Sequence, residues 1–206
     1  MPRSSQLEAV ADRLKVPREK IEDLKVLAVE AAARVADGRP GYGMLLDSTY
    51  GRRAFPRAAE QGFWIGRPVE KPGSRPLDFD HLPDLGSHLV EWPVGHTVKC
   101  LCFYHPDDSD ELKARQEREL LRLSDAARTV GRELLVEIIA GKNGPVDDTT
   151  IARVLTRLYD LGIRPDWWKL EPQKSAEAWR AIADVIVARD PWCRGIVLLG
   201  HDAAPQ

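Results

Sequence analysis

The 206-residue sequence lacks features that would place it in or across a membrane. No apolar run approaches the roughly 20 residues that a membrane-spanning helix needs. The N-terminal stretch "MPRSSQLEAVADRLK" has no signal-peptide core. We therefore expect a cytoplasmic protein with no membrane partner.

The sequence also lacks an excess of charge of either sign. Thirty Lys and Arg residues face 32 Asp and Glu residues, which leaves a formal net charge of -2. No global field then favours nucleic acid or an anionic membrane, so a nucleic-acid partner is not expected. Any anionic ligand must therefore be bound by a local site rather than attracted by the net charge of the protein.

Residues that would hold metals or nucleotides are scarce. The three cysteines are Cys100, Cys102 and Cys193, and the first two lie on one face of a predicted strand, as small buried hydrophobes do. Neither GxGxxG nor GxxxxGK[ST] occurs, so a glycine-rich phosphate turn is not indicated. The histidines show no ligand spacing: His81, His88, His96, His105 and His201. We expect no metal and no cofactor.

Hydrophobic residues make up 43% of the chain, with 15 Gly and 15 Pro, so residues 1–206 form one folded domain. Helical periodicity runs over 5–37, with a restart after Pro17. Short strands are predicted at 41–47 and 62–66, followed by a Pro-rich connection and a helix beginning near Leu82.

The second half of the sequence alternates strands with helices. Strands are predicted at 97–104, 133–139, 166–170 and 195–200, with helices at 108–129, 148–161 and 175–189. The strands are short apolar runs without polar alternation, which is typical of a parallel sheet covered by helices. A TIM-type barrel and a doubly wound sheet both fit this pattern.

Four strands each carry one charged residue in an otherwise apolar run: Asp47, Lys99, Glu137 and Lys169. In a barrel the inward positions of neighbouring strands converge on one axis, whereas an open sheet spreads them apart. Convergence of these charges favours a TIM-type (β/α)8 barrel.

Such a cluster suits amine catalysis. Positive Lys99 would lower the pKa of Lys169, freeing its nitrogen to attack a ketone. Glu137 would shuttle protons, and Asp47 or Glu171 would serve the substrate hydroxyl. Each residue also has a structural interpretation without catalysis. Lys169 in "PDWWKLEP" could be an edge-strand lysine that pairs with Glu171, and Glu137 could form a buried salt bridge. Asp47 could cap the turn "DSTYG".

The stretches "GYGMLLDSTYG", "VKCLCFYHPDD", "ELLVEII" and "GIRPDWWKLEP" resemble 5-dehydro-2-deoxyphosphogluconate aldolase, a domain often found behind a sugar kinase in fused proteins of myo-inositol catabolism. They are also similar to class I tagatose-1,6-bisphosphate aldolases. The likeness covers about Ser5 to Ala203.

This resemblance implies a TIM barrel that cleaves 2-deoxy-5-keto-D-gluconate 6-phosphate to dihydroxyacetone phosphate and malonate semialdehyde. By position, Lys169 would form the Schiff base, Lys99 and Glu137 would be its partners, and Asp47 would line the pocket.

The chain departs from the family pattern at both ends. About six strands can be counted where a closed barrel has eight, and the first and last are missing. Gly200 ends the last strand as a candidate substrate-binding position, but the partner phosphate turn is absent, and Arg52, Arg67 and Arg194 are weaker candidates. Two open sheet edges predict a homo-oligomer. The alternative function is a truncated, inactive barrel that acts as a binding or scaffolding subunit.

Overall fold

The computed structural model describes residues 4–79 and 84–200. Over these residues the chain forms seven α-helices and six strands. The helices are α1 (Ser4–Leu14), α2 (Lys20–Ala36), α3 (Ala54–Glu60), α4 (Leu85–Val90), α5 (Asp110–Thr129), α6 (Thr150–Asp160) and α7 (Ala176–Arg189). The strands are β1 (Gly43–Leu45), β2 (Trp64–Pro68), β3 (His96–Phe103), β4 (Leu134–Ile139), β5 (Trp167–Leu170) and β6 (Gly195–Leu198).

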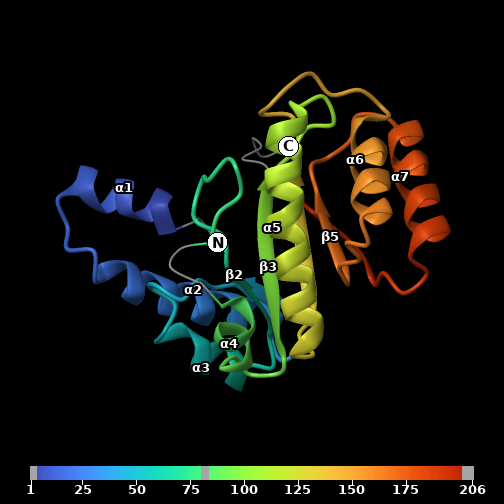
Figure 1. Cartoon of the computed structure of the whole chain (residues 1–206). Coiled ribbons are helices and arrows are strands. Elements are labelled where there is room, and N and C mark those ends of the chain that lie inside the picture. Colours follow the sequence, from blue (N-terminus) through green and yellow to red (C-terminus); the bar gives the residue numbers. More distant parts are fainter. Residues whose placement is uncertain (1–3, 80–83, 201–206) are drawn as a thin grey trace.

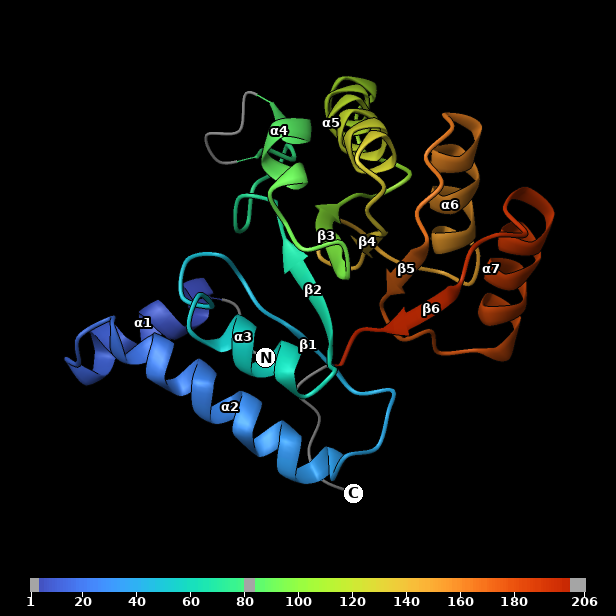
Figure 2. The same ribbon diagram turned by 90° about the horizontal axis from the view of Figure 1, so that it is seen from below.

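The six strands form one sheet in chain order, β1 to β6, and every neighbouring pair is parallel. Each connection between sequential strands contains a helix, which is how parallel neighbours are joined. The sheet curls, and the strands follow an arc with α5, α6 and α7 on its outer side (Figures 1 and 2). The predicted α/β class is confirmed, and the curled sheet matches part of a TIM-type barrel.

Alternation along the strands separates a helix-covered face from the concave face. Cys100, Cys102, Val136 and Ile138 of β3 and β4 are fully buried in the main hydrophobic core, together with side chains of α5 and α6. Because successive side chains point to opposite faces, Lys99 and Glu137 lie on the concave face. The three cysteines are free, and Cys100 and Cys102 are buried, as predicted.

Trp168 fixes the orientation of β5. Its indole Nε1 donates to the Tyr159 hydroxyl of α6 at 2.7 Å, and the two rings meet edge to face with centroids 5.6 Å apart. Both side chains are buried. Since Trp168 is committed to the helix-covered face, its neighbour Lys169 must point to the concave face.

The N-terminal half forms two smaller cores. Leu7 and Ala11 of α1 pack with Ile21 of α2, while a second cluster lies between α2, α3 and the first two strands. The predicted restart after Pro17 is confirmed: α1 ends before this proline and α2 begins after it, because proline cannot continue a helix interior. Helix α3 is short and was missed in the sequence.

Several predicted boundaries were wrong. Strand β1 ends at Leu45 rather than at Asp47 and is only partly buried, and β2 runs two residues later than predicted. Helix α4 begins at Leu85, whereas Leu82 lies outside the described residues. No helix in the described part of the chain is long and apolar enough to span a membrane.

The sheet has two edges. Strands β1 and β6 each pair on one side only within residues 4–79 and 84–200, and Leu198 on β6 is 60% exposed. Six strands are therefore seen, and the two further strands of a closed barrel are not among the described residues.

Candidate active site

Four charged side chains form a chain of ion pairs on the concave face of the sheet. Glu70 Oε1 lies 2.7 Å from Lys99 Nζ, which lies 2.9 Å from Glu137 Oε2. The other oxygen of Glu137, Oε1, lies 3.2 Å from Lys169 Nζ. We call these four residues the tetrad, and its charges alternate in sign.

Strand register explains why the tetrad assembles. Glu137 on β4 is directly opposite Lys169 on β5, so their side chains meet across adjacent strands. Lys99 on β3 is opposite Leu135 of β4, which is one inward position before Glu137. The long side chain of Lys99 spans the distance from Leu135 to Glu137. The structure thus brings together three of the four strand charges singled out in the sequence.

The tetrad is shielded from solvent. The side chains of Glu137, Lys99 and Glu70 are 1%, 4% and 7% exposed, and that of Lys169 is 12% exposed. Lys169 is therefore the member that a ligand on the concave face can reach most readily. Buried charges persist only when they are paired, and the alternation of signs provides that pairing.

Burial and pairing act in opposite directions on these groups. Burial favours the neutral form of Lys99, but Glu70 and then Glu137 favour the ammonium, and together they raise the pKa of Lys99. Burial raises the pKa of Glu137, but Lys99 and Lys169 outweigh it and the pKa is lowered. Lys99 is therefore charged and Glu137 ionised at neutral pH.

This arrangement alters the electrostatic argument drawn from the sequence. Lys99 was expected to act on Lys169 through like-charge repulsion, but Glu137 contacts both ammonium groups and Glu70 adds a second negative charge. The repulsion is therefore offset by two carboxylates.

Glu70 is the tetrad member that sequence reasoning missed. It follows β2 by two residues, at the carboxyl end, and the backbone N–H of Val69 donates to the Lys99 carbonyl at 3.0 Å. Because the strand was predicted to end at residue 66, Glu70 was placed in a loop. Strand parity would have found it, since Glu70 continues the inward series of Gly66 and Pro68.

Asp47 is engaged in a different set of contacts. Its Oδ2 is paired with the ammonium of Lys25 on α2, which is 1% exposed. Its Oδ1 accepts from the backbone N–H groups of Thr49 at 3.0 Å and Tyr50 at 2.9 Å. These contacts match the turn-capping alternative considered for Asp47, and they lie after the end of β1. A role for Asp47 in the pocket stays a prediction.

Glu171 and Gly200, the two predicted substrate-binding positions, both lie beyond strand ends. Glu171 Oε2 accepts from the backbone N–H groups of Ala140 at 2.8 Å and Gly141 at 3.0 Å, so it ties the end of β5 to the end of β4. Gly200 is exposed and lies two residues after β6. Contact of either residue with substrate stays a prediction.

The arginines considered for phosphate binding differ in their surroundings. Arg67 is stacked between the rings of Phe55 and Trp92 at 4.6 and 3.9 Å and donates to Ser48 at 2.9 Å. Burial lowers its pKa to about 10. Arg194 pairs with Glu133 at 2.8 Å. Both of these arginines therefore have structural partners.

No group of three potential metal-ligating side chains converges within residues 4–79 and 84–200. His81 and His201 lie outside these ranges. The tetrad itself consists of two ammonium groups and two carboxylates.

Comparison with known proteins finds similarity to a curated enzyme. The chain is 26% identical over 170 residues to tagatose 1,6-diphosphate aldolase 2 of Streptococcus agalactiae serotype III (strain NEM316). The alignment covers 81% of this chain and 46% of that protein, so the chain spans about half the length of this curated relative. A family model described as "Uncharacterized protein conserved in bacteria (DUF2090)" matches residues 2–206. The chain belongs to the DUF2090 family.

Proposed function

We propose that this protein carries the catalytic lysine of a class I aldolase, with Lys169 forming a Schiff base with a ketose phosphate. The observation that carries the proposal is the position of Lys169 Nζ, 3.2 Å from a buried carboxylate oxygen of Glu137. The pair lies on the concave face of a curled parallel sheet, which is where barrel enzymes place catalytic side chains at the carboxyl ends of strands. The similarity to a tagatose-diphosphate aldolase supports the same reaction class.

The proposed reaction begins with transfer of a proton from Lys169 to Glu137. The neutral amine attacks the ketone carbon, and Glu137 returns a proton so that water leaves and an iminium forms. A base then removes the proton from the hydroxyl on the carbon two positions from the iminium carbon. The bond from that hydroxyl-bearing carbon to the carbon next to the iminium breaks, the hydroxyl-bearing carbon leaves as an aldehyde, and the electron pair of the broken bond forms an enamine. Protonation of the enamine and addition of water release the second product.

Lys99 and Glu70 have separate roles in this scheme. Lys99, held positive by two carboxylates, keeps Glu137 ionised and therefore able to accept a proton. Glu70 Oε2 is buried and has no hydrogen-bond partner in the described part of the chain. An unpaired buried acceptor is costly, so a substrate hydroxyl is a suitable donor for it. Glu70 thus joins Asp47 and Glu171 as a candidate for the hydroxyl.

For the substrate we propose 2-deoxy-5-keto-D-gluconate 6-phosphate, cleaved to dihydroxyacetone phosphate and malonate semialdehyde as part of myo-inositol catabolism. The support is the likeness of the stretches around Asp47, Lys99 and Lys169 to that aldolase family. Tagatose 1,6-bisphosphate, the substrate class in the relative's name, is the competing substrate. Rates of aldehyde release with the two phosphates compared side by side decide between them.

Borohydride trapping tests the Schiff base directly. The protein is incubated with dihydroxyacetone phosphate, reduced, digested and mapped by mass spectrometry. We expect a stable adduct on the peptide that contains Lys169, and none in Lys169→Arg, since arginine stays charged and forms no imine. Lys174→Arg is the matched control, because Lys174 is an exposed lysine four residues after the end of β5. An adduct that persists in Lys169→Arg contradicts the proposal.

A second candidate function is a non-catalytic barrel-like subunit. It is favoured by the two sheet edges, β1 and β6, that have no strand partner on one side within the described residues. Such edges pair readily with another chain, so we propose a homo-oligomer in either case. A folded protein with neither adduct nor turnover supports the binding role. A monodisperse monomer in light scattering contradicts the oligomer.

A further inference from the structure

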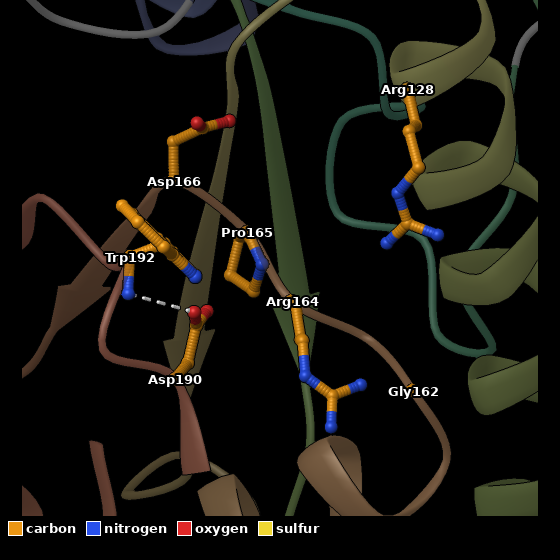
Figure 3. A pocket seen from close by; sticks show the side chains of 7 residues that line it. All are labelled: Arg128, Gly162, Arg164, Pro165, Asp166, Asp190 and Trp192. Carbon is orange, nitrogen blue, oxygen red and sulfur yellow. Dashed lines mark hydrogen bonds between the residues drawn. The ribbon is translucent and has the colours of Figure 1, made fainter. Parts of the chain in front are cut away.

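A cavity of about 540 Å³ lies at the amino-terminal ends of β5 and β6. It is lined by Arg128 near the end of α5, by residues of the 162–166 segment, and by Asp190 and Trp192 before β6 (Figure 3). Its size falls within the roughly 300–1,000 Å³ that is usual for small-molecule pockets. Lys169 lies toward the other end of β5, so this cavity is separate from the tetrad.

The turn before β6 leaves Trp192 exposed to solvent. Its side chain is 88% exposed, the most exposed of the large hydrophobic residues in the described part of the chain. The backbone N–H of Trp192 donates to Asp190 Oδ1 at 3.2 Å, and that of Cys193 donates to the Asp190 carbonyl at 3.2 Å. The Asp190 turn therefore holds the backbone of Trp192 while its indole stays open for stacking.

The charged groups of the cavity are not equally available. Asp190 is 5% exposed and bonded to the Trp192 turn, and Asp166 Oδ2 accepts from the backbone N–H of Leu134 at 2.8 Å. Arg164 has no hydrogen bond or ion pair to another residue in the described ranges. Arg128 makes one long contact, 3.9 Å to Asp125, between side chains that are 61% and 74% exposed. Two guanidinium groups are thus free to meet an anion.

Figure 3 shows Arg128 entering from α5 and Trp192 from the segment before β6, with Arg164 and Pro165 between them. An indole face binds planar rings, and guanidinium groups bind phosphate through paired hydrogen bonds. Asp166 Oδ1 forms a long ion pair with Arg194, 4.0 Å from its Nε and beyond hydrogen-bond reach, so this oxygen can still accept from a hydroxyl donor. A carboxylate at this position disfavours a bare anion and favours a ligand that carries hydroxyl groups.

We propose that this cavity binds a nucleoside phosphate. The base stacks on Trp192, the phosphate contacts Arg164 and Arg128, and a ribose hydroxyl donates to Asp166. The site uses side chains on two loops and on α5, so it needs none of the glycine-rich phosphate turns that the sequence lacks. It does not depend on aldolase chemistry at Lys169.

Calorimetric titration with adenosine monophosphate tests this site. We expect binding to the wild type, at least about tenfold weaker binding in Trp192→Ala from lost stacking, and a similar loss in Arg164→Ala. Both side chains are exposed, so both variants should fold, which thermal melting checks. Arg180→Ala is the matched control, because Arg180 is a 70% exposed arginine on α7 outside the cavity and should bind like the wild type.

Adenosine tests the contribution of the base and ribose, and inorganic phosphate tests that of the phosphate charge. Each should bind more weakly than the intact nucleotide. The proposal is overturned by an absence of nucleotide binding to the wild type, by undiminished binding in both cavity variants, or by inorganic phosphate binding as tightly as adenosine monophosphate. Borohydride trapping on Lys169 should be unchanged in Trp192→Ala and Arg164→Ala, so the outcome at this cavity is distinguishable from that at the tetrad.

Discussion

Replacement of Lys99 by methionine is the sharpest test of the tetrad. Methionine has a similar length but no charge, so Lys99→Met removes two charge-assisted contacts, at 2.7 Å to Glu70 and 2.9 Å to Glu137. Hydrogen bonds to charged groups contribute about 1.5–3 kcal/mol each. Glu70 then stays buried without its cation, whereas Glu137 keeps Lys169.

The expected loss is about 3–5 kcal/mol in the free energy of unfolding at neutral pH, the range for breaking a buried ion pair by removing one partner. This is a large share of the roughly 5–15 kcal/mol by which domains are stable. Urea unfolding followed by tryptophan fluorescence measures it. The matched control is Lys174→Met, at an exposed lysine, which should change stability by no more than about 0.5 kcal/mol.

The pH dependence of this loss separates an electrostatic cause from a packing cause. In the wild type, burial raises the pKa of Glu137, but Lys99 and Lys169 outweigh it and lower that pKa. The ionised Glu137 therefore stabilises the folded protein at pH values above the pKa of the unfolded state. This stabilisation is lost as the pH falls through the pKa of the folded state. In Lys99→Met, Glu137 keeps only one of the two ammonium groups that lower its pKa, so burial has a larger effect and protonation of Glu137 relieves part of the penalty.

The difference between wild type and Lys99→Met should therefore shrink between about pH 7 and about pH 4. A loss below about 1 kcal/mol at neutral pH would show that the carboxylates are hydrated or paired elsewhere, which refutes the tetrad. A loss of full size that is constant with pH would identify a packing defect instead.

Two further substitutions test the structural contacts of predicted site residues. Asp47→Asn keeps an oxygen for the turn but leaves the ammonium of Lys25 buried without its carboxylate, so we expect a loss of about 3 kcal/mol in chemical denaturation. An active variant of unchanged stability would contradict that ion pair. Glu171→Ala should cost about 1–3 kcal/mol in thermal unfolding, because two backbone N–H groups after β4 lose their acceptor, while Glu171→Gln should restore most of it. Equal melting temperatures for the two variants would count against this role.

The sequence alone predicted which segments in the second half of the chain are strands and which are helices. Apolar runs flanked by turn residues predicted β3 to β6, and the helices between them required parallel pairing. Those predictions held because the helices, of 11 to 20 residues, are long enough to show their period and the strands between them are apolar runs. The first half was harder, since β1 has three residues and α3 seven, too short to show a period.

The site could be predicted where it depends on strand parity. Lys99, Glu137 and Lys169 are the charged exceptions in apolar strands, and a parallel sheet brings such residues to one face. Glu70 was missed because it depends on where β2 ends, and strand boundaries are the least certain part of a sequence interpretation. The pairing of Asp47 with Lys25 could not be foreseen, because it joins a turn to a helix 22 positions earlier in the chain.

The sequence by itself determined the α/β class, the parallel pairing of the strands, and that Lys99, Glu137 and Lys169 share a face, because period and parity are local properties of the chain. Tertiary structure alone decided which of those charges touch. The alternation of carboxylate and ammonium from Glu70 to Lys169, and the cavity beside Trp192, both arise from side chains of elements far apart in sequence. Contacts of that kind are set by the curl of the sheet and the register of neighbouring strands, which no single segment encodes.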